Sequence, residues 1–250
     1  MSDDRYVLIT GASGGLGQAV ARRLADDGWW LALAGRDIGR LRAAYGDTDY
    51  PLLTGDVSTP EGAREVLEQC WQQYGQPPDA LVHCVGSILV APLHRTTPTQ
   101  YHSVLSANLD SAFHTLAAWV SAQRDAKRPG AAVFVSSAAA RIGTPNHEAV
   151  AAAKAGLEGL VRAAAATYAS SGLRINAVAP GLMDTPAATG LISSPAAREA
   201  AARQYPLPGI GVPAQLADLM AWLLSPAAER VTGQVWSVDG GFSVVRPLVR

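Results

Sequence analysis

Three glycines near the start of the chain have a spacing that suits phosphate binding. Gly11, Gly15 and Gly17 follow a run of β-forming residues at 6–9 and precede an amphipathic segment at 18–27. Glycine lets the backbone turn sharply and approach an anion, while the free N–H groups at a helix start face the phosphate. The spacing is G-x-x-x-G-x-G, which differs from the common G-x-G-x-x-G fingerprint. Any tight turn can recruit glycine, but a glycine turn between strand and helix favours a phosphate site.

The elements that would position this turn alternate along the whole chain. Expected strands lie at 6–9, 29–34, 51–54, 80–85, 131–135, 173–178 and 234–238. Helices are expected at 18–27, from 58 or 59 to 74, through 104–116, at 146–168 and at 213–224. Alternation without a break in composition predicts one α/β domain over residues 1–250, with a doubly wound, mostly parallel sheet covered by helices on both faces.

A long irregular stretch follows the sixth expected strand. Residues 180–208 are rich in Pro, Ala, Ser and Gly, with no clear period. They follow the carboxyl end of a strand, where ligands bind in open α/β sheets, so residues 182–210 are a candidate substrate lid. A plain surface loop fits the composition equally well.

Composition limits the class of protein. The 250 residues are 48% hydrophobic and 16% charged, with a net charge of −1, which indicates a buried globular core and no nucleic-acid groove. We expect no membrane partner, because no apolar run reaches about 18 residues, and no export signal, because the start at 1–4 is acidic. Two cysteines make no disulfide framework, and no Cys/His cluster has metal spacing. A cytoplasmic protein without metal is expected.

Eight stretches resemble the short-chain dehydrogenase/reductase family in order along the chain. They are residues 10–17, 56–57, 81–86, Asn108, 136–137, Lys154, 174–181 and 238–241. The resemblance implies a Rossmann fold with seven strands and an oxidoreductase that acts on a small-molecule substrate. It also implies a homotetramer or homodimer with the alanine-rich helix 146–168 in one interface. The apolar tail 242–250 is a second candidate interface.

The resemblance also assigns residues to a nicotinamide cofactor. It implies that the glycine turn surrounds the pyrophosphate and adenosine ribose and that Asp56 and Val57 contact the adenine. Further cofactor contacts are expected from Ser13, Leu16, Gly86, Lys154, Pro180, Gly181, Met183 and Thr185. The family usually has Asn-Asn-Ala-Gly where this chain has residues 83–86, His-Cys-Val-Gly. His83 is either a structural histidine or a functional replacement for the amide.

The end of the second expected strand indicates which cofactor is preferred. A carboxylate there would bind the ribose 2′-OH of NAD and repel a 2′-phosphate. This chain has Gly35 and Arg36 instead, and a guanidinium can hold a phosphate with two hydrogen bonds. Asp37 is expected to cap the next helix. NADP(H) is therefore the preferred cofactor, with NAD(H) as the alternative.

The catalytic positions show one large departure from the family. The family uses a tyrosine four residues before the lysine, but position 150 is valine. Asn108, Ser137 and Lys154 stand at the expected spacing. A lone lysine in the alanine-rich run 149–155 fits a ribose-binding role. Asn108 is either an exposed polar residue or, as the resemblance implies, the point where its helix is interrupted.

His147 could supply the missing proton chemistry. Residues 145–158, 185–190 and 239–243 resemble the enoyl-acyl-carrier-protein reductase branch of the family. That branch has its tyrosine seven residues before the lysine, and in this chain His147 stands at that position. Residues i and i+7 lie on one helix face, two turns apart. Imidazole, with an ordinary pKa of about 6.5, can move protons near neutral pH. A polar residue in the first helical turn is the alternative.

Two functions are compatible with these residues. The first is an NADP(H)-dependent oxidoreductase that transfers hydride between nicotinamide and a small carbonyl or enoyl substrate. Asn108, Ser137, His147 and Lys154 would be its catalytic residues. The second is a catalytically weak or inactive NADP(H)-binding protein that acts as a partner subunit or redox sensor.

Overall fold

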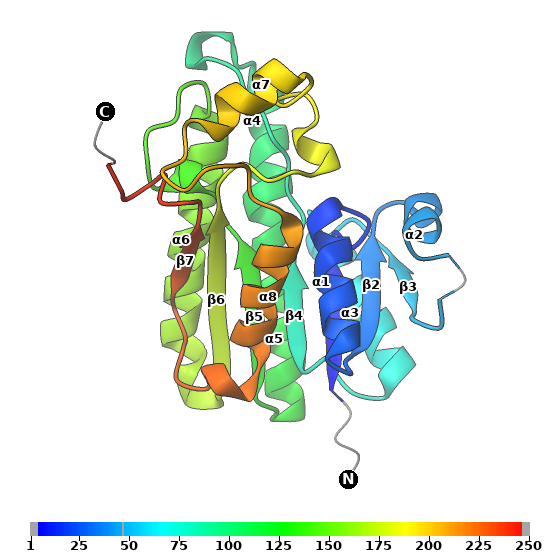
Figure 1. Cartoon of the computed structure of the whole chain (residues 1–250). Helices are drawn as coiled ribbons and strands as arrows, with labels where there is room; N and C mark the ends of the chain where they lie inside the picture. Colours follow the sequence, from blue (N-terminus) through cyan, green and yellow to red (C-terminus); the bar gives the residue numbers. More distant parts are fainter. Residues whose placement is uncertain (1–4, 47, 247–250) are drawn as a thin grey trace.

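The computed structural model describes residues 5–46 and 48–246 and contains one parallel sheet (Figure 1). Its seven strands run in the order β3-β2-β1-β4-β5-β6-β7, and every neighbouring pair is parallel. The strands are β1 Tyr6–Thr10, β2 Trp30–Gly35, β3 Leu52–Thr54, β4 Ala80–His83, β5 Gly130–Val135, β6 Leu173–Pro180 and β7 Val235–Val238. The predicted seven-stranded α/β fold is confirmed.

Helices cover both faces of this sheet (Figure 1). They are α1 Gly15–Asp26, α2 Ile38–Tyr45, α3 Pro60–Tyr74, α4 Pro98–Leu105, α5 Ser111–Ala126, α6 Glu148–Tyr168, α7 Pro195–Ala202 and α8 Pro213–Leu224. Neighbouring strand residues point to opposite faces, so Val7 and Ile9 join the core under α1 and α8 while Leu8 joins the core under α3, α5 and α6. Strands buried on both faces explain the continuous apolar runs in the sequence.

The order of the strands in the sheet indicates at which edge a ligand would bind. β1 lies between β2 and β4, so the connections that leave β1 and β4 depart to opposite faces of the sheet. Such a switch point opens a crevice at the carboxyl ends of the strands, where ligands bind. In Figure 1 this edge is at the top, with α4 and α7 above it. The glycine turn after β1 lies at this edge.

The structure corrects four local expectations. The helix expected from 146 begins at Glu148, because Asn146 has a φ of +63° and ends the preceding turn. The expected long helix through 104–116 is divided into α4 and α5 by a π-helical turn at Ser106–Asp110. The region expected to be irregular at 180–208 contains α7, and α2, of which only the cap Asp37 was expected, extends over Ile38–Tyr45. Both additional helices are short and begin at capping side chains, which accept backbone N–H bonds.

Within residues 5–46 and 48–246, no helix combines the length and apolar character needed to cross a membrane. The same part of the chain has no group of three or more His, Cys, Asp or Glu side chains arranged to hold a metal ion. The acidic start at 1–4 and the last four residues of the expected interface tail, 247–250, lie outside the described residues.

Candidate functional site

A groove runs along the carboxyl ends of the strands. Two cavities of about 500 Å³ and about 450 Å³ form it, and both are lined by Gly86 and Ser87. The larger cavity lies beside β2 and β3, and the other lies beside β5, α6 and β6. All predicted cofactor-binding positions line one or both cavities, namely Gly11, Ser13, Gly15, Leu16, Gly17, Arg36, Asp56, Val57, Gly86, Lys154, Pro180, Gly181, Met183 and Thr185.

The glycine turn is packed too tightly for larger residues. Gly11 has a φ of +69°, and a Cβ atom there would lie 2.8 Å from the backbone carbon of Cys84. A Cβ atom on Gly17 would collide with the carbonyl oxygen of Gly11, and one on Gly15 would lie 2.9 Å from Cδ of Pro186. The first turn of α1 has no acidic residue, and its N-cap, Gly14, provides no side-chain bond. Backbone N–H groups at the start of α1 are thus left for a phosphate.

The β2 end of the groove is basic. Arg36 and Arg40 both line its larger cavity, and within the described ranges neither forms an ion pair. The Asp37 carboxylate accepts the backbone N–H of Arg40 at 3.1 Å, which confirms its predicted role as the cap of α2. Arg40 was missed in the sequence, and it lies at this cavity because it belongs to the first turn of α2, which begins directly after the cap Asp37. Two guanidinium groups can therefore meet a phosphate here.

Asp56 is held in its charged form at the same end of the groove. Burial acts to raise the pKa of Asp56, but hydrogen bonds from Ser58 and the positive charge of Arg36 outweigh it and lower that pKa. The Ser58 hydroxyl donates to its carboxylate at 2.7 Å, and the Ser58 N–H donates at 3.0 Å. A fixed carboxylate next to Val57 suits recognition of the amino group of a base.

Three residues meet at the other end of the groove. A Cβ atom on Gly86 would lie 2.9 Å from Oδ1 of Asn108 and 3.4 Å from Nζ of Lys154, so glycine leaves both polar groups open to the groove. The Asn108 amide donates to the Val104 carbonyl at 2.9 Å and to the Ser87 hydroxyl at 3.0 Å. Asn108 is buried at the centre of the π-helical turn, which confirms that the helix is interrupted there and excludes the exposed alternative.

Lys154 is buried where a polar ligand would complete its bonds. Its ammonium donates to the Val135 carbonyl at 2.7 Å, and its side chain comes from α6 into the groove. Burial lowers the pKa of Lys154 to about 8, against a smaller upward effect of Cys84. The ammonium carries three donors, and one is used by Val135, so two remain for a ligand hydroxyl pair such as a ribose diol.

A third cavity, of about 300 Å³, adjoins this end of the groove. It shares Ser137, Val150, Gly181 and Leu182 with the groove, and its walls are mainly apolar. His147 lines this cavity and not the groove, and it precedes α6 with a φ of −113°. The expected common helix face of His147 and Lys154 is therefore wrong, because His147 lies outside the helix.

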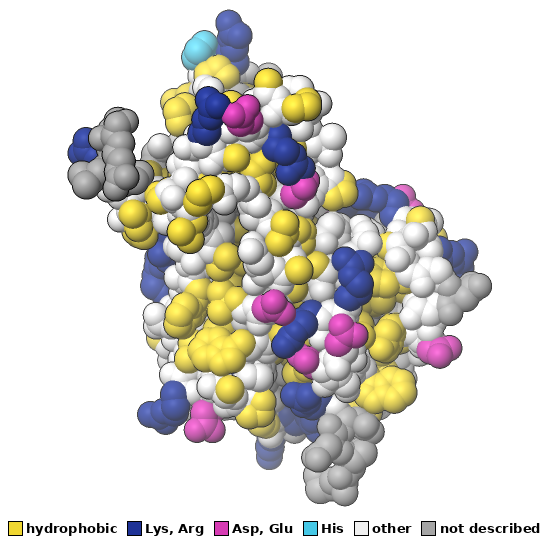
Figure 2. All heavy atoms as spheres, viewed as in Figure 1, with side chains coloured by type: hydrophobic (Ala, Val, Ile, Leu, Met, Phe, Trp, Pro, Cys, Tyr) yellow, Lys and Arg dark blue, Asp and Glu magenta, His cyan; other side chains and the backbone are white. Residues whose placement is uncertain are grey.

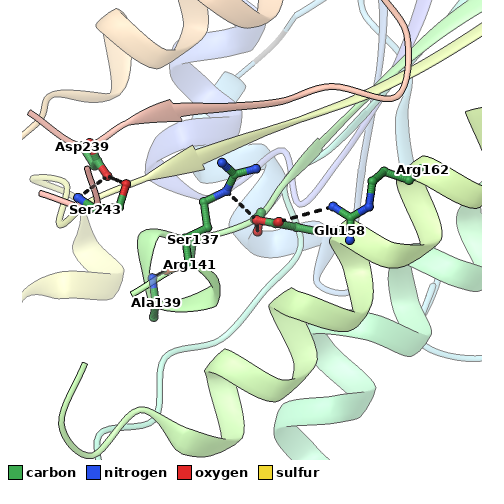
Figure 3. Close-up of polar contacts among 8 residues, drawn as sticks. Ser137, Ala139, Arg141, Glu158, Arg162, Asp239 and Ser243 are labelled. Atoms are coloured by element: carbon green, nitrogen blue, oxygen red, sulfur yellow. Dashed lines mark hydrogen bonds and ion pairs between the residues drawn. The ribbon is translucent and has the colours of Figure 1, made fainter. Parts of the chain in front are cut away.

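The loop that carries Ser137 is clamped to α6. Glu158 accepts hydrogen bonds from the Ser136 hydroxyl at 2.9 Å and from Nε of Arg141 at 3.1 Å, and Arg162 lies 3.7 Å away (Figure 3). Glu158 is buried, so these contacts replace its hydration. The Ser137 hydroxyl accepts the N–H of Ala139 at 3.2 Å and keeps its hydrogen for another partner. Glu158 thus fixes the loop on both sides of Ser137.

Comparison with known proteins agrees with this geometry. The family model described as Enoyl-(Acyl carrier protein) reductase matches residues 11–243. Cis-4-hydroxycyclohexanecarboxylate dehydrogenase of Sinomonas cyclohexanicum is 34% identical, covering 97% of this chain and 98% of the relative. The chain belongs to the short-chain dehydrogenase/reductase family. The members of this family are oxidoreductases, and the matching relatives are named as dehydrogenases and reductases.

Solved structures of short-chain dehydrogenases and reductases share the fold along their whole length. Levodione reductase is 30% identical with a TM-score of 0.89, and the match covers 97% of this chain and 99% of that chain. Thermoplasma acidophilum aldohexose dehydrogenase is 27% identical with a TM-score of 0.89, covering 99% of this chain and 97% of that chain. The fold of this chain therefore corresponds to nearly the full length of both proteins.

The structure shows the surroundings of His83 and Val150, the two positions at which the sequence suggests a departure from the family pattern. His83, where the family usually has asparagine, is buried, with Nδ1 at 2.9 Å from the Thr10 hydroxyl and Nε2 at 3.1 Å from the Ser111 hydroxyl. This side chain ties β4 to β1 and α5, so the structural interpretation holds. Val150 is also buried, and it packs in an apolar cluster with Val104 and Ala149. A valine in this cluster can shape a cavity but cannot move a proton.

Proposed function

We propose that the protein is an NADP(H)-dependent oxidoreductase that transfers hydride between nicotinamide and a small carbonyl or enoyl substrate. The observation that carries the proposal is the junction of the groove with the apolar cavity at Ser137 and Val150. A dinucleotide along the groove would place its reactive ring at this junction, within reach of a substrate in the cavity. The nicotinamide, when bound, supplies or accepts the hydride.

The preference for NADP(H) rests on the two guanidinium groups at the β2 end. Arg36 and Arg40 form no ion pair among residues 5–46 and 48–246, and the carboxylate of the neighbouring Asp37 is engaged as a cap. A 2′-phosphate would receive charge-assisted hydrogen bonds from both. NAD(H), which lacks this phosphate, would gain nothing from them.

The polar residues divide the remaining work. Lys154 would hold the nicotinamide ribose with its two remaining donors, and Asn108 keeps the π-helical turn and the Ser87 segment in place. The Ser137 hydroxyl would donate to the substrate oxygen. Nδ1 of His147 donates to the Pro145 carbonyl at 2.7 Å, so Nε2 of the neutral ring is an acceptor. His147 is therefore suited to take a proton from an alcohol, and it donates one only as imidazolium.

A second candidate is a weak or inactive NADP(H)-binding protein that acts as a partner subunit or redox sensor. The buried Val150 favours it, because valine provides no phenol four residues before Lys154. The two candidates share the groove and differ in turnover. Both are compatible with a homotetramer or homodimer. Exposed small residues of α6 support such an assembly, as do the exposed Trp222 of α8 and Trp236 of β7, whose rings pack edge to face. Figure 2 shows exposed hydrophobic side chains on the face of the molecule that carries α8 and β7. Both cysteines are free, as is usual in the cytoplasm.

The test measures NADPH oxidation with a panel of ketones, quinones and enoyl thioesters, and alcohol oxidation by NADP⁺ in the reverse direction. NADPH binding is measured by fluorescence. Steady turnover supports the oxidoreductase, and loss of alcohol oxidation in His147→Phe supports the role of His147. Tight NADPH binding without turnover of any compound, in either direction, supports the second candidate. Val150→Tyr is the companion variant, and a gain of carbonyl reduction would show that Ser137 and Lys154 are competently placed.

A further inference from the structure

A phenol projects to the cavity beside Val150 from a different part of the chain. Tyr205 follows α7, and its ring packs against Phe242 with the two centroids 5.2 Å apart. It lines the cavity of about 300 Å³ together with Ser137 and Val150. The protein thus has a hydroxyl group in the substrate cavity although the family tyrosine is absent.

The Tyr205 hydroxyl lies against the wall that the cavity shares with the groove. A Cβ atom on Gly181 would lie 2.7 Å from a ring carbon of Tyr205 and 3.1 Å from its hydroxyl oxygen. Gly181 and Leu182 line both the groove and the cavity. The glycine is what allows the phenol to approach the cofactor side this closely.

The hydrogen-bond pattern leaves the phenolic hydrogen unused. The Tyr205 oxygen accepts the Leu182 N–H at 2.7 Å, which fixes its position. In the part of the chain that the structure describes, Tyr205 donates to no acceptor, whereas Tyr45 and Tyr74 each donate to a backbone carbonyl. A partly buried hydroxyl that accepts one bond and donates none is prepared to donate to a ligand.

Burial and the nearby charge of Asp239 raise the pKa of Tyr205, while the bond from the Leu182 N–H acts in the opposite direction. The hydroxyl is therefore protonated at neutral pH and is a donor rather than a base. Tyr205 and His147 then have different capacities in the cavity, because the neutral imidazole presents an acceptor. Tyr205 is thus suited to donate a proton during carbonyl reduction, and His147 is suited to accept one during alcohol oxidation.

We propose that Tyr205 is the catalytic proton donor for carbonyl reduction, a role that rests on the oxidoreductase function proposed above. The carbonyl carbon receives a hydride from NADPH, which is thereby oxidised to NADP⁺, and the C=O π bond breaks. The resulting alkoxide oxygen takes the proton of Tyr205, forming the alcohol O–H bond. The phenolate recovers a proton from water. The apolar walls, with Ala138, Leu191 and Phe242, suit an alicyclic ketone of cyclohexanone size.

The experiment compares Tyr205→Phe with the wild type and with Tyr101→Phe, an exposed tyrosine of α4 that lines none of the three cavities. The first measurement is cyclohexanone reduction by NADPH, for which we expect a fall of about 100-fold or more in kcat in Tyr205→Phe. The second is binding of cyclohexanecarboxamide, a non-reducible carbonyl analogue, to the enzyme–NADPH complex, for which we expect an affinity loss of about fivefold. NADPH affinity should be unchanged. Val150→Tyr in the Tyr205→Phe background should restore reduction.

The two measurements separate this inference from the proposed function. If the wild type reduces ketones and Tyr205→Phe matches it in both measurements, the inference is overturned and the function stands. If the wild type reduces nothing, the function and the proton-donor role are both overturned, and amide binding that depends on Tyr205 would then show only that its hydroxyl binds a ligand oxygen. If the wild type reduces no ketone, and the amide binds neither protein or binds the wild type and Tyr205→Phe equally, the proposed function and the inference are both overturned.

Discussion

The buried imidazole of His83 makes the stability of the fold depend on pH. Burial, with a smaller contribution from the charge of Lys154, lowers the pKa of His83 from 6.5 to about 3. The folded protein therefore holds the ring neutral, while the unfolded chain binds a proton below about pH 6.5. Stability is full above that pH and is lost as the pH falls toward the folded pKa. His83→Asn removes the titrating group and keeps a polar amide at this position.

The size of the effect follows from the two pKa values. Each pH unit between them changes the free energy of unfolding by about 1.4 kcal/mol. Because the slope develops gradually around the unfolded pKa, the wild type should lose about 2 kcal/mol between about pH 7 and pH 5 through this group. Most carboxyl groups titrate below this range. The His83→Asn variant should not show this loss between about pH 7 and pH 5, even if the variant is less stable than the wild type at neutral pH.

The pH dependence of the free energy of unfolding is measured by urea unfolding at a series of pH values, at one protein concentration and one ionic strength. His94→Asn is the control, because His94 is exposed and should leave the pH dependence unchanged. The informative quantity is the difference between the unfolding free energies at the two ends of the range. Equal differences in His83→Asn and the wild type would refute the buried neutral imidazole.

Three further predictions concern the groove and its support. Arg36→Ala should weaken NADPH about tenfold or more and leave NADH unchanged in fluorescence titrations, whereas Arg42→Ala, whose side chain lines neither groove cavity, should change neither. Gly17→Ala should abolish cofactor binding and lower Tm, because the added Cβ would collide with the Gly11 carbonyl. Gly159→Ala is the control, because an added Cβ there meets open space, and it should raise the stability of α6 by about 1 kcal/mol. Glu158→Gln should destabilise the protein by about 2 kcal/mol in urea unfolding and lower kcat more than it raises KM, since the Ser137 loop loses its clamp; an unchanged kcat would contradict that positioning role.

The parts of the molecule that could be predicted from sequence are those with local causes. Seven β-forming runs became seven strands, and the five inner runs are mostly apolar because inner parallel strands are buried on both faces. The fourteen cofactor positions came together because carboxyl ends of parallel strands share one edge. Asn108 could be placed at a helix interruption only through the resemblance, since nothing in its neighbours forces a π-helical turn.

The remainder depends on contacts between distant residues. Tyr205 reaches the cavity by packing against Gly181 and Phe242, and no local period signals this. His147 lies outside α6 because Asn146 takes a left-handed conformation, which helical spacing could not reveal. α7 had a readable start at Ser194 and Pro195, but eight residues are too short for a clear period.

The contact between the glycine turn and the segment after β6 has a kinetic consequence. Gly15 faces Thr185 and Pro186, which lie over the start of α1 and line the same groove. A dinucleotide with its pyrophosphate at this helix start would lie beneath that segment, so its departure requires the segment to move. We therefore expect movement of the segment at Thr185 and Pro186 to control how fast the dinucleotide exchanges.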